Sequence, residues 1–281
     1  MNTPSSHFVQ VSSPVIANRR LARDTYLIRL QTPEIARLIR PGQFVMLRQV
    51  RGTDPLLGRP FALYDTYLND HDEPAGIDVV YLVVGKMTRL LATLTPDDIV
   101  EAWGPLGNGF PVPQTTDHVG LVAGGIGQTP FLAQIRDLLG ERGYAGQPPL
   151  RRARRVSIYY GVRTADLAAG LDDFRGAGAE IHLATDDGSL GFHGFVTRLL
   201  EQQTPPPGHL FGCGPEPMLK ALVRHARSCG IPCHVSLETP MACGVGICFS
   251  CVTPISTSDG WDYRRVCVEG PVFDARQWKG D

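Results

Sequence analysis

Four cysteines near the end of the chain carry the clearest chemistry in the sequence. Three of them, Cys243, Cys248 and Cys251, lie in the stretch ACGVGICFSC, and the fourth is Cys267. The segments between them are four, two and fifteen residues long. The chain has seven cysteines, an odd number that a framework of paired disulfides does not explain. We therefore interpret this group of thiols as ligands of a metal centre.

Three interpretations of the four thiols compete. A spacing of four and then two residues is that of plant-type [2Fe–2S] ferredoxins, although their fourth ligand lies further along the chain than Cys267. Gly244 and Gly246 lie inside the loop, where backbone N–H groups can approach sulfur and stabilise a negatively charged cluster. Zinc sites usually combine two C-x2-C hooks, and only one is present here. The third possibility is unligated core thiols, which is how we interpret Cys229 and Cys233.

The residues before the cysteines must position them, and they begin with a region of short strands. Apolar and polar side chains alternate in the runs 25–30, 43–48 and 77–84, and turn residues separate these runs. A helical stretch at 88–94 interrupts them. This pattern predicts an antiparallel β-barrel.

A second region alternates apolar strands with helical segments, which predicts an α/β fold with a parallel sheet and helices on both faces. The expected strands are 119–123, 156–160, 180–184, 209–213 and 234–237, and the expected helices are 130–139, 164–169, 194–202 and 216–228. We divide the chain into a barrel domain at 1–112, a nucleotide-binding domain at 113–237 and a cysteine segment at 238–281. The last is too poor in apolar residues to form a core of its own.

Composition excludes several classes of function. The net charge is −1, which gives no general attraction toward nucleic acid or membrane surfaces. No run of 18 apolar residues is present, and the first residues do not resemble an export signal. We expect a cytoplasmic protein that binds neither nucleic acid nor membrane.

The barrel region contains candidate contacts for a flavin. An iron–sulfur cluster moves one electron at a time, so a flavin is the expected partner for two-electron chemistry. Arg59 places a cation beside the extended run that ends at Tyr64, which suits a pyrophosphate and an isoalloxazine edge. The segment 85–88 precedes a short helix whose N–H groups can take a phosphate. A surface ion pair of Arg59 and a plain helix cap at Thr88 are the alternatives.

The second region contains two glycine-rich turns suited to a nicotinamide dinucleotide. AGGIGQTP, at 123–130, follows one strand, and FGCGPEPM, at 211–218, lies at the carboxyl end of another, where open α/β sheets bind ligands. Cys213 would contact the nicotinamide ring or be a buried thiol. An ordinary strand–helix turn is the alternative for the first motif. Arg163 follows a strand and is suitably placed for a 2′-phosphate, but one arginine does not decide between NAD and NADP.

Taken in order, these motifs resemble the ferredoxin–NADP⁺ reductase superfamily. The stretches ACGVGICFSC and RVCVEGPVF, at 265–273, resemble one branch, the electron-transfer subunits of NAD-linked (type B) dihydroorotate dehydrogenase. GPLGNGF at 104–110 and TDDGS at 185–189 also resemble that family, so the similarity covers nearly the whole chain.

The resemblance implies an antiparallel β-barrel FAD domain, an α/β parallel-sheet NAD domain and a small C-terminal [2Fe–2S] segment. It implies that Cys243, Cys248, Cys251 and Cys267 ligate the cluster. The implied FAD contacts are Arg59, Pro60, Phe61, Ala62, Val80, Tyr81, Leu82, Met87 and Thr88. The implied NAD contacts are Gly124, Gly125, Gly127, Gly214, Pro215 and Glu216. The family often has glycine at the place of Met87 and arginine at the place of Leu82, so this chain departs from it at two FAD positions.

The implied function is electron transfer from the FMN of a catalytic dihydroorotate dehydrogenase subunit, through the cluster and FAD, to NAD⁺. The implied assembly is a heterotetramer of two catalytic and two electron-transfer subunits. One alternative keeps the cofactors and changes the partner to a sulfhydrogenase or a ferredoxin-dependent transhydrogenase. Another is a zinc-stapled nucleotide-binding module without redox activity.

Overall fold

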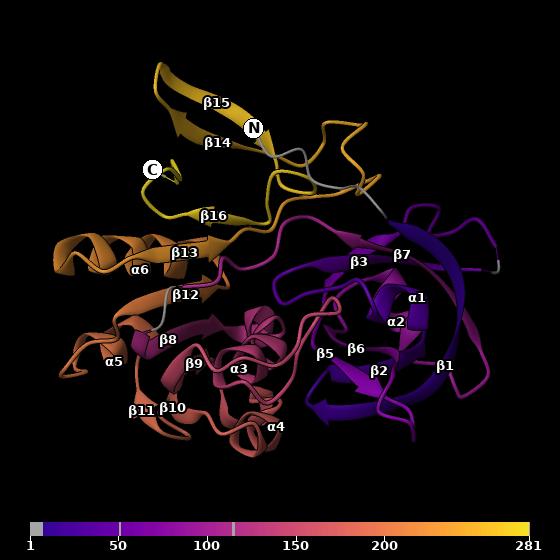
Figure 1. Ribbon diagram of the computed structural model, residues 1–281, viewed down its shortest axis with the longest axis horizontal. Helices are drawn as coiled ribbons and strands as arrows, with labels where there is room; N and C mark the ends of the chain where they lie inside the picture. The colour runs from indigo at the N-terminus through magenta and orange to yellow at the C-terminus, as the bar shows by residue number, and fades with distance from the viewer. Residues whose placement is uncertain (1–7, 51, 114–115, 281) are drawn as a thin grey trace.

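The computed structural model describes residues 8–50, 52–113 and 116–280 (Figure 1). Its first sheet has seven antiparallel strands in the order β4-β3-β7-β1-β2-β6-β5 and curls into a barrel. Apolar side chains such as Ile28, Val45 and Val79 fill its interior. The strands are β1 (Val9–Ala22), β2 (Thr25–Gln31), β3 (Phe44–Gln49), β4 (Arg59–Ala62), β5 (Asp65–Leu68), β6 (Pro74–Leu82) and β7 (Ile99–Leu106), with helices α1 (Pro33–Ala36) and α2 (Lys86–Leu91) between them.

The long strand β1 joins the two halves of the barrel. Its first residues pair with β7 and its later residues pair with β2. Irregularities between Val15 and Ala17, and between Arg20 and Ala22, bend the strand so that it serves both partners. The alternating runs predicted at 25–30, 43–48 and 77–84 correspond to β2, β3 and β6. No such run predicts β1, because polar residues interrupt the alternation of apolar and polar side chains along it.

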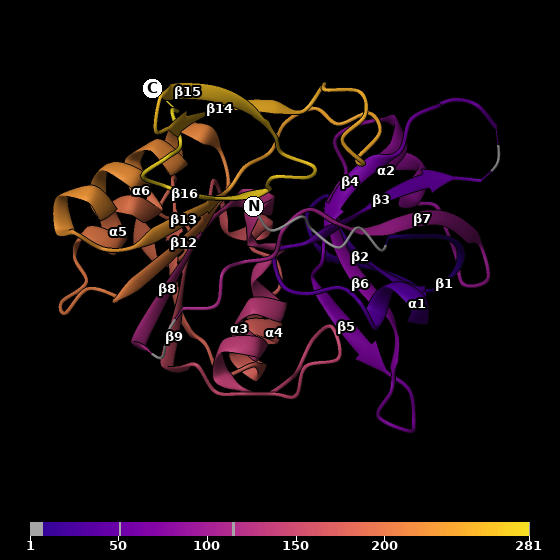
Figure 2. The same ribbon diagram turned by 45° about the horizontal axis from the view of Figure 1, so that its top comes forward.

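The second sheet also has seven strands, in the order β11-β10-β9-β8-β12-β13-β16. All neighbours are parallel except β16, which runs antiparallel to β13. Helices α3 and α4 cover one face and α5 and α6 cover the other, so the predicted fold class is confirmed (Figures 1 and 2). The elements are β8 (Thr116–Gly124), η1 (Gly125–Gln128), α3 (Phe131–Leu139), β9 (Ala153–Val162), η2 (Ala165–Leu167), α4 (Leu171–Gly176), β10 (Glu180–Thr185), β11 (Phe192–His193), α5 (Val196–Glu201), β12 (His209–Cys213), α6 (Glu216–Cys229), β13 (Cys233–Ser236) and β16 (Val272–Asp274).

The helix predicted at 164–169 is wrong in extent. Only the single 3-10 turn η2 forms there, and the α-helix of this connection is α4. The polar groups of this stretch bond elsewhere: Asp166 pairs with Arg23 of the barrel at 2.9 Å, and the Ala165 N–H donates to the Ser189 hydroxyl. These contacts compete with helix formation.

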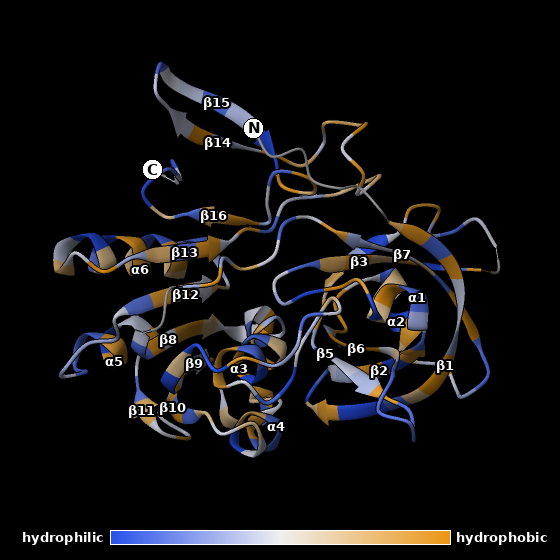
Figure 3. Ribbon diagram, in the orientation of Figure 1, coloured by the Kyte–Doolittle hydropathy of each residue, from blue (hydrophilic) through white to orange (hydrophobic). Residues whose placement is uncertain are grey.

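The last 40 or so residues pack against both large sheets, as the views in Figures 1 and 2 agree. They form a projecting hairpin of β14 (Val252–Thr257) and β15 (Gly260–Arg265) before returning as β16. Hydrophobic residues are frequent along the central strands of both large sheets but sparse in β15 (Figure 3). After β7, Asn108 holds the returning chain, because its amide donates to the carbonyl oxygens of Glu269 and Val272.

The predicted domain boundaries stay a prediction, and residues 1–7 and 281 of that division lie outside the described residues. The cysteine segment contributes strand β16 to the edge of the second sheet, so it shares that sheet with the residues of the α/β region.

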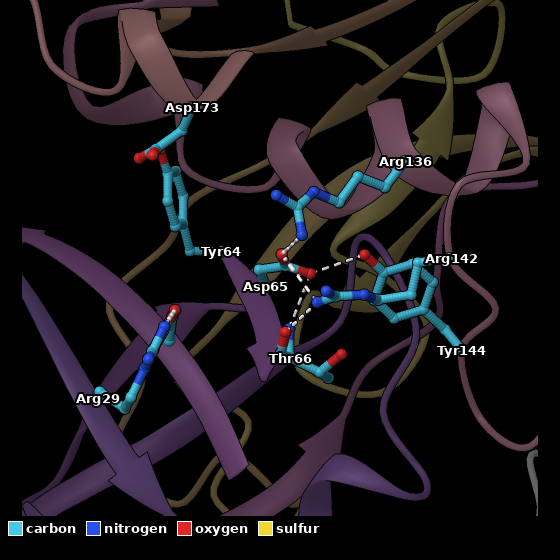
Figure 4. A network of polar contacts seen from close by, with 9 residues as sticks. Arg29, Tyr64, Asp65, Thr66, Arg136, Arg142, Tyr144 and Asp173 are labelled. Carbon is cyan, nitrogen blue, oxygen red and sulfur yellow. Dashed lines mark hydrogen bonds and ion pairs between the residues drawn. The ribbon is translucent and has the colours of Figure 1, made fainter. Parts of the chain in front are cut away.

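A network of polar contacts fixes the barrel to the α/β sheet (Figure 4). Asp65 on β5 is buried and pairs with Arg136 of α3 at 2.7 Å and with Arg142 at 3.0 Å. Its other carboxylate oxygen accepts a hydrogen bond from the Tyr144 hydroxyl at 2.7 Å. Next to it, the Tyr64 hydroxyl donates to Asp173 of α4 at 2.8 Å. These contacts set the position of each sheet relative to the other, and hence of the cavities that lie between them.

Candidate functional site

The structure brings the four cysteines of the last segment together. Cys251 and Cys267 are buried in a hydrophobic core, whereas Cys248 is exposed and Cys243 is half-buried. The Cys243 thiol contributes to lowering the pKa of Cys248, and the Cys251 and Cys243 thiols contribute to raising the pKa of Cys267, so the four lie near one another. Within the described part of the chain, no three His, Cys, Asp or Glu side chains converge as the ligands of one ion do.

Backbone N–H groups of the cysteine loop point at these sulfurs. The Val245 N–H donates to Cys243 Sγ at 3.4 Å, and the N–H of Gly246 is directed at Cys267. Hydrogen bonds from the hydroxyl and N–H of Ser250 lower the pKa of Cys248 to about 6, whereas burial raises the pKa of Cys267 to about 12. Donors arranged in this way stabilise negative charge on sulfur, so the loop fits an anionic iron–sulfur cluster.

Two glycines give the loop its shape. Gly244 and Gly246 have φ values of +73° and +83°, which side chains of L-residues rarely allow. A Cβ on Gly244 would lie 2.7 Å from Met46 Cγ, and one on Gly246 would lie 2.5 Å from Val268 Cγ2. The loop therefore lies directly against barrel strand β3 on one side and against the residue after Cys267 on the other.

A cavity of about 600 Å³ lies between the barrel and the α/β sheet. Barrel strands β4 and β6 form one wall, and the chain from Ser236 to Met241 forms another. Arg59 has no acidic partner among the described residues, since its guanidinium donates only to the carbonyl oxygens of Leu57 and Gly58. All the residues expected to contact FAD line this cavity: Arg59, Pro60, Phe61, Ala62, Val80, Tyr81, Leu82, Met87 and Thr88.

The helix α2 borders the same cavity. The Thr88 hydroxyl accepts hydrogen bonds from the N–H groups of Val84 and Gly85, both at 3.0 Å, so Thr88 also caps this helix. Met87 is only 3% exposed and packs in the barrel core. Its side chain is thus directed mainly into the barrel.

A second cavity, of about 840 Å³, lies at the carboxyl ends of the parallel strands. The glycine turn after β8 contributes Gly124, Gly125 and Gly127 to its wall, and the turn after β12 contributes Gly214 and Pro215. Arg163 also lines it. Glu216 lines neither cavity, since its carboxylate pairs on the surface with Lys220 at 3.0 Å.

The two cavities adjoin, because Leu82, Val84, Ile126 and Glu238 line both of them. Cys213 lies on the side of the smaller cavity. Burial raises the pKa of the Cys213 thiol, and the nearby Glu238 carboxylate raises it further. Desolvation likewise raises the pKa of Glu238. The junction therefore holds two groups whose pKa values are raised above their ordinary range.

Sequence reasoning missed the residues at the end of β13 and directly after it. Ser236, Glu238 and Thr239 line the smaller cavity, and Pro240 and Met241 continue its wall toward Cys243. A signal was present, because this segment starts at the carboxyl end of a parallel strand, where ligands of such sheets bind.

Comparison with known proteins identifies related chains. Residues 238–279 match the family model described as the iron–sulfur cluster binding domain of dihydroorotate dehydrogenase B. Two curated relatives are each a "Dihydroorotate dehydrogenase B (NAD(+)), electron transfer subunit". The one from Geobacillus thermodenitrificans is 39% identical over 93% of this chain and 95% of its own length. The one from Desulforamulus reducens is 36% identical over 94% of this chain and 95% of its own length.

Solved structures agree on the fold. A structure of an NADH-dependent reduced ferredoxin–NADP oxidoreductase, described in connection with flavin-based electron bifurcation, superposes with a TM-score of 0.79 at 26% identity, covering 96% of this chain and 91% of the other. Phthalate dioxygenase reductase shares the fold with a TM-score of 0.59 at 19% identity, covering 99% and 98%. With relatives of this identity along nearly its whole length, the chain belongs to the family of dihydroorotate dehydrogenase B (NAD(+)) electron transfer subunits.

Proposed function

We propose that this protein passes electrons from the FMN of a catalytic dihydroorotate dehydrogenase subunit, through a [2Fe–2S] cluster and FAD, to NAD⁺. The observation that carries the proposal is the continuity of three sites. The two cavities share four lining residues, and Met241, in the wall of the smaller one, lies two positions before Cys243 in the chain. A flavin in the smaller cavity would thus have the cysteine loop on one side and the dinucleotide cavity on the other.

Cys243, Cys248, Cys251 and Cys267 would hold the cluster. When bound, the cluster supplies single-electron transfer. The protein supplies four sulfurs, the N–H donors of the loop and a largely apolar surround, because two of the four thiols belong to the hydrophobic core. Such donors and burial are the means by which a protein adjusts the potential of a cluster.

Arg59 would neutralise the flavin pyrophosphate, and the extended strands β4 and β6 would hold the ring. FAD, when bound, connects the single-electron chemistry of the cluster with the hydride chemistry of NAD. Cys213 and Glu238 would help to exclude water where the two cavities meet, and burial would keep a proton on Sγ of Cys213. The glycine turns after β8 and β12 would bind the dinucleotide.

The partner subunit would dock on the cysteine loop. Ile247 is 80% exposed and Phe249 is 62% exposed, and both lie between cluster cysteines. Apolar side chains exposed in this way are typical of the centre of an interface. We propose a heterotetramer of two catalytic and two electron-transfer subunits. We also propose that it lies in the cytoplasm, where thiols stay reduced, because all seven cysteines are free thiols. No helix of the described residues is long and apolar enough to cross a membrane.

A second candidate function is electron transfer to a ferredoxin-linked partner, which the structural similarity to the ferredoxin–NADP oxidoreductase favours. Both candidates use the same cofactors, so the partner distinguishes them. The higher identity to the dihydroorotate dehydrogenase relatives supports the first.

Anaerobic purification from the native cells tests the proposal. We expect about two irons, two labile sulfides and one FAD per chain. Mass spectrometry should identify an FMN-containing dihydroorotate dehydrogenase subunit in the same complex, and dihydroorotate should reduce NAD⁺ only when both subunits are present. A chain that contains zinc and no iron would contradict the proposal. A cluster-containing complex with a different catalytic subunit would favour the second candidate.

A further inference from the structure

Trp103 lies on the outward face of barrel strand β7. Val100 and Ala102 belong to the core inside the barrel, and successive side chains of a strand point to opposite faces, so Trp103 is directed away from that interior. It is half-buried there, because it packs against the hydrophobic core that contains Cys251 and Cys267. This large aromatic side chain therefore belongs to the junction between the barrel and the cysteine segment.

The indole N–H of Trp103 holds the first cysteine of the loop. Its Nε1 donates a hydrogen bond to the backbone carbonyl oxygen of Cys243 at 3.2 Å, across 140 positions of sequence. The next residue, Gly244, packs closely against barrel strand β3, since a Cβ there would lie 2.7 Å from Met46 Cγ. Packing keeps the loop against the barrel, and the directional hydrogen bond sets where along the barrel the Cys243 carbonyl lies.

The far edge of the indole ring rests on Gly58. A Cβ on Gly58 would overlap Cη2 of Trp103 and would lie 3.2 Å from its Cζ2. The φ of Gly58 is outside the left-handed region, so glycine is required here for space and not for backbone conformation. Gly58 directly precedes Arg59, and its carbonyl oxygen accepts a hydrogen bond from the Arg59 guanidinium at 3.0 Å.

Trp103 thus connects two walls of the smaller cavity without entering it. Arg59 lines the wall that the barrel provides, and Met241, two positions before Cys243, lines another. Trp103 is not among the lining residues, but it touches the neighbour of the first wall at Gly58 and the continuation of the second at Cys243. A displacement of the ring at one end must therefore move the hydrogen bond at the other.

We propose that Trp103 is a positioning residue that fixes the cysteine loop relative to the smaller cavity, with its ring seated on Gly58 and its N–H on the Cys243 carbonyl. The inference rests on the proposed function in taking the loop as the cluster site and the cavity as the FAD site. Trp103 would touch neither group. It would set the separation across which single electrons pass between them.

Two substitutions disturb the two ends of this contact separately. Trp103→Phe keeps an aromatic ring, removes the N–H donor and shortens the side chain. Gly58→Ala keeps the donor and pushes the ring away from its seat. Gly176→Ala is the control for adding a methyl group, because a Cβ there has nothing within 4 Å and its φ is also outside the left-handed region. Trp261→Phe, at a tryptophan that is 53% exposed in the cysteine segment, is the control for losing an indole.

The anaerobic complex that contains FAD and cluster is used for every measurement. Iron and FAD are counted per chain, and the rate at which iron passes to the chelator bathophenanthroline disulfonate is recorded in the absence of any substrate. In a stopped-flow experiment with NADH, flavin absorbance and cluster absorbance are followed separately. The chelator reports how often the loop opens, and the two absorbances separate hydride transfer from the later electron transfer.

We expect Trp103→Phe and Gly58→Ala to keep their FAD and to lose iron to the chelator about two- to tenfold faster, as the loss of one hydrogen bond implies. Bleaching of the cluster by NADH should slow by about the same factor, since the competent position of the loop is populated for a smaller fraction of the time, while flavin bleaching stays unchanged. Both controls should match the wild type. Combining the two substitutions should add nothing to Trp103→Phe, because the shorter ring leaves room for the new methyl group.

Unchanged iron loss and unchanged cluster bleaching in Trp103→Phe would overturn the inference. Lowered FAD content in Gly58→Ala with normal cluster rates would also overturn it, because the ring would then support only the Arg59 wall. Additive effects in the double variant would show that the two ends act independently and would count equally against it. A wild-type complex that binds FAD but holds no cluster would refute the proposed function together with this inference, whereas normal wild-type electron transfer with unaffected variants would refute the role of Trp103 alone.

Discussion

Replacing Gly246 by alanine should destabilise the cysteine loop selectively. At φ +83° an L-residue costs roughly 1–2 kcal/mol relative to glycine. The new Cβ would also lie 2.5 Å from Val268 Cγ2, and relieving such overpacking costs about 1–3 kcal/mol. The expected total is therefore about 2–5 kcal/mol, concentrated where the Gly246 N–H is directed at Cys267 and its carbonyl accepts from Arg265 at 3.0 Å.

Anaerobic urea titration measures this effect with two probes, the visible absorbance of the cluster and the fluorescence of the flavin. The cluster transition of Gly246→Ala should move to much lower urea, while the flavin transition moves little. Gly230→Ala is the matched control: its φ is +65°, but a Cβ there has nothing within 4 Å. It should cost only the backbone strain, about 1–2 kcal/mol, and leave the cluster transition in place.

A second substitution separates strain from overpacking. In a Val268→Ala background the contacting methyl group is absent, so Gly246→Ala should cost only its backbone strain. The two substitutions should therefore couple by about 1–3 kcal/mol. Equal losses in Gly246→Ala and Gly230→Ala, with no coupling to Val268, would refute the reasoning that the loop packs tightly at this residue.

Three further predictions follow from the site and the core. Cys248→Ser should reduce the iron content while FAD stays bound, and Cys229→Ser, at an exposed cysteine outside the loop, should leave both unchanged in metal and flavin analysis. Arg59→Gln should weaken FAD binding by about ten- to a hundredfold, through the loss of a charge-assisted contact worth about 1.5–3 kcal/mol, without loss of iron; unchanged flavin affinity would exclude Arg59 from the site. Burial, and then Arg155, lower the pKa of His118 from 6.5 to about 4, so the neutral form is favoured in the fold. The stability that His118 contributes should be complete above pH 6.5 and fall as the pH drops toward 4; urea midpoints measured across that range should fall less steeply in His118→Gln than in the wild type.

Much of the fold could be predicted because short stretches of the sequence carry the pattern of the strand or helix that they form. Alternating runs identified β2, β3 and β6, and strand–helix alternation identified the parallel sheet. The strand β1 has no such signal, because polar residues interrupt its alternation of apolar and polar side chains and register shifts bend it. The helix expected at 164–169 failed because Asp166 bonds to Arg23 of the barrel, a partner that lies 143 positions earlier in the sequence.

The candidate site likewise contains residues that local sequence patterns predict and residues that only the folded structure identifies. Cysteine spacing and glycine turns are local patterns, and the structure gathers those residues at two adjoining cavities and one loop. Glu238 was not singled out, because its place after a parallel strand marks the segment as a whole and does not distinguish this carboxylate from other polar residues. The position of Glu238 between two cavities arises only when the barrel and the α/β sheet come together.

The return of the chain as β16 has a consequence for evolution and for engineering. The cysteine segment is held by a strand of the α/β sheet on one side and by Asn108 from the barrel on the other. Transplanting residues 238–279 onto another reductase would therefore transfer the ligands without the two anchors that place them. Natural exchange of this redox element between proteins should involve whole chains, and a graft will succeed only where the recipient already supplies an open sheet edge and an asparagine in the loop after its last barrel strand.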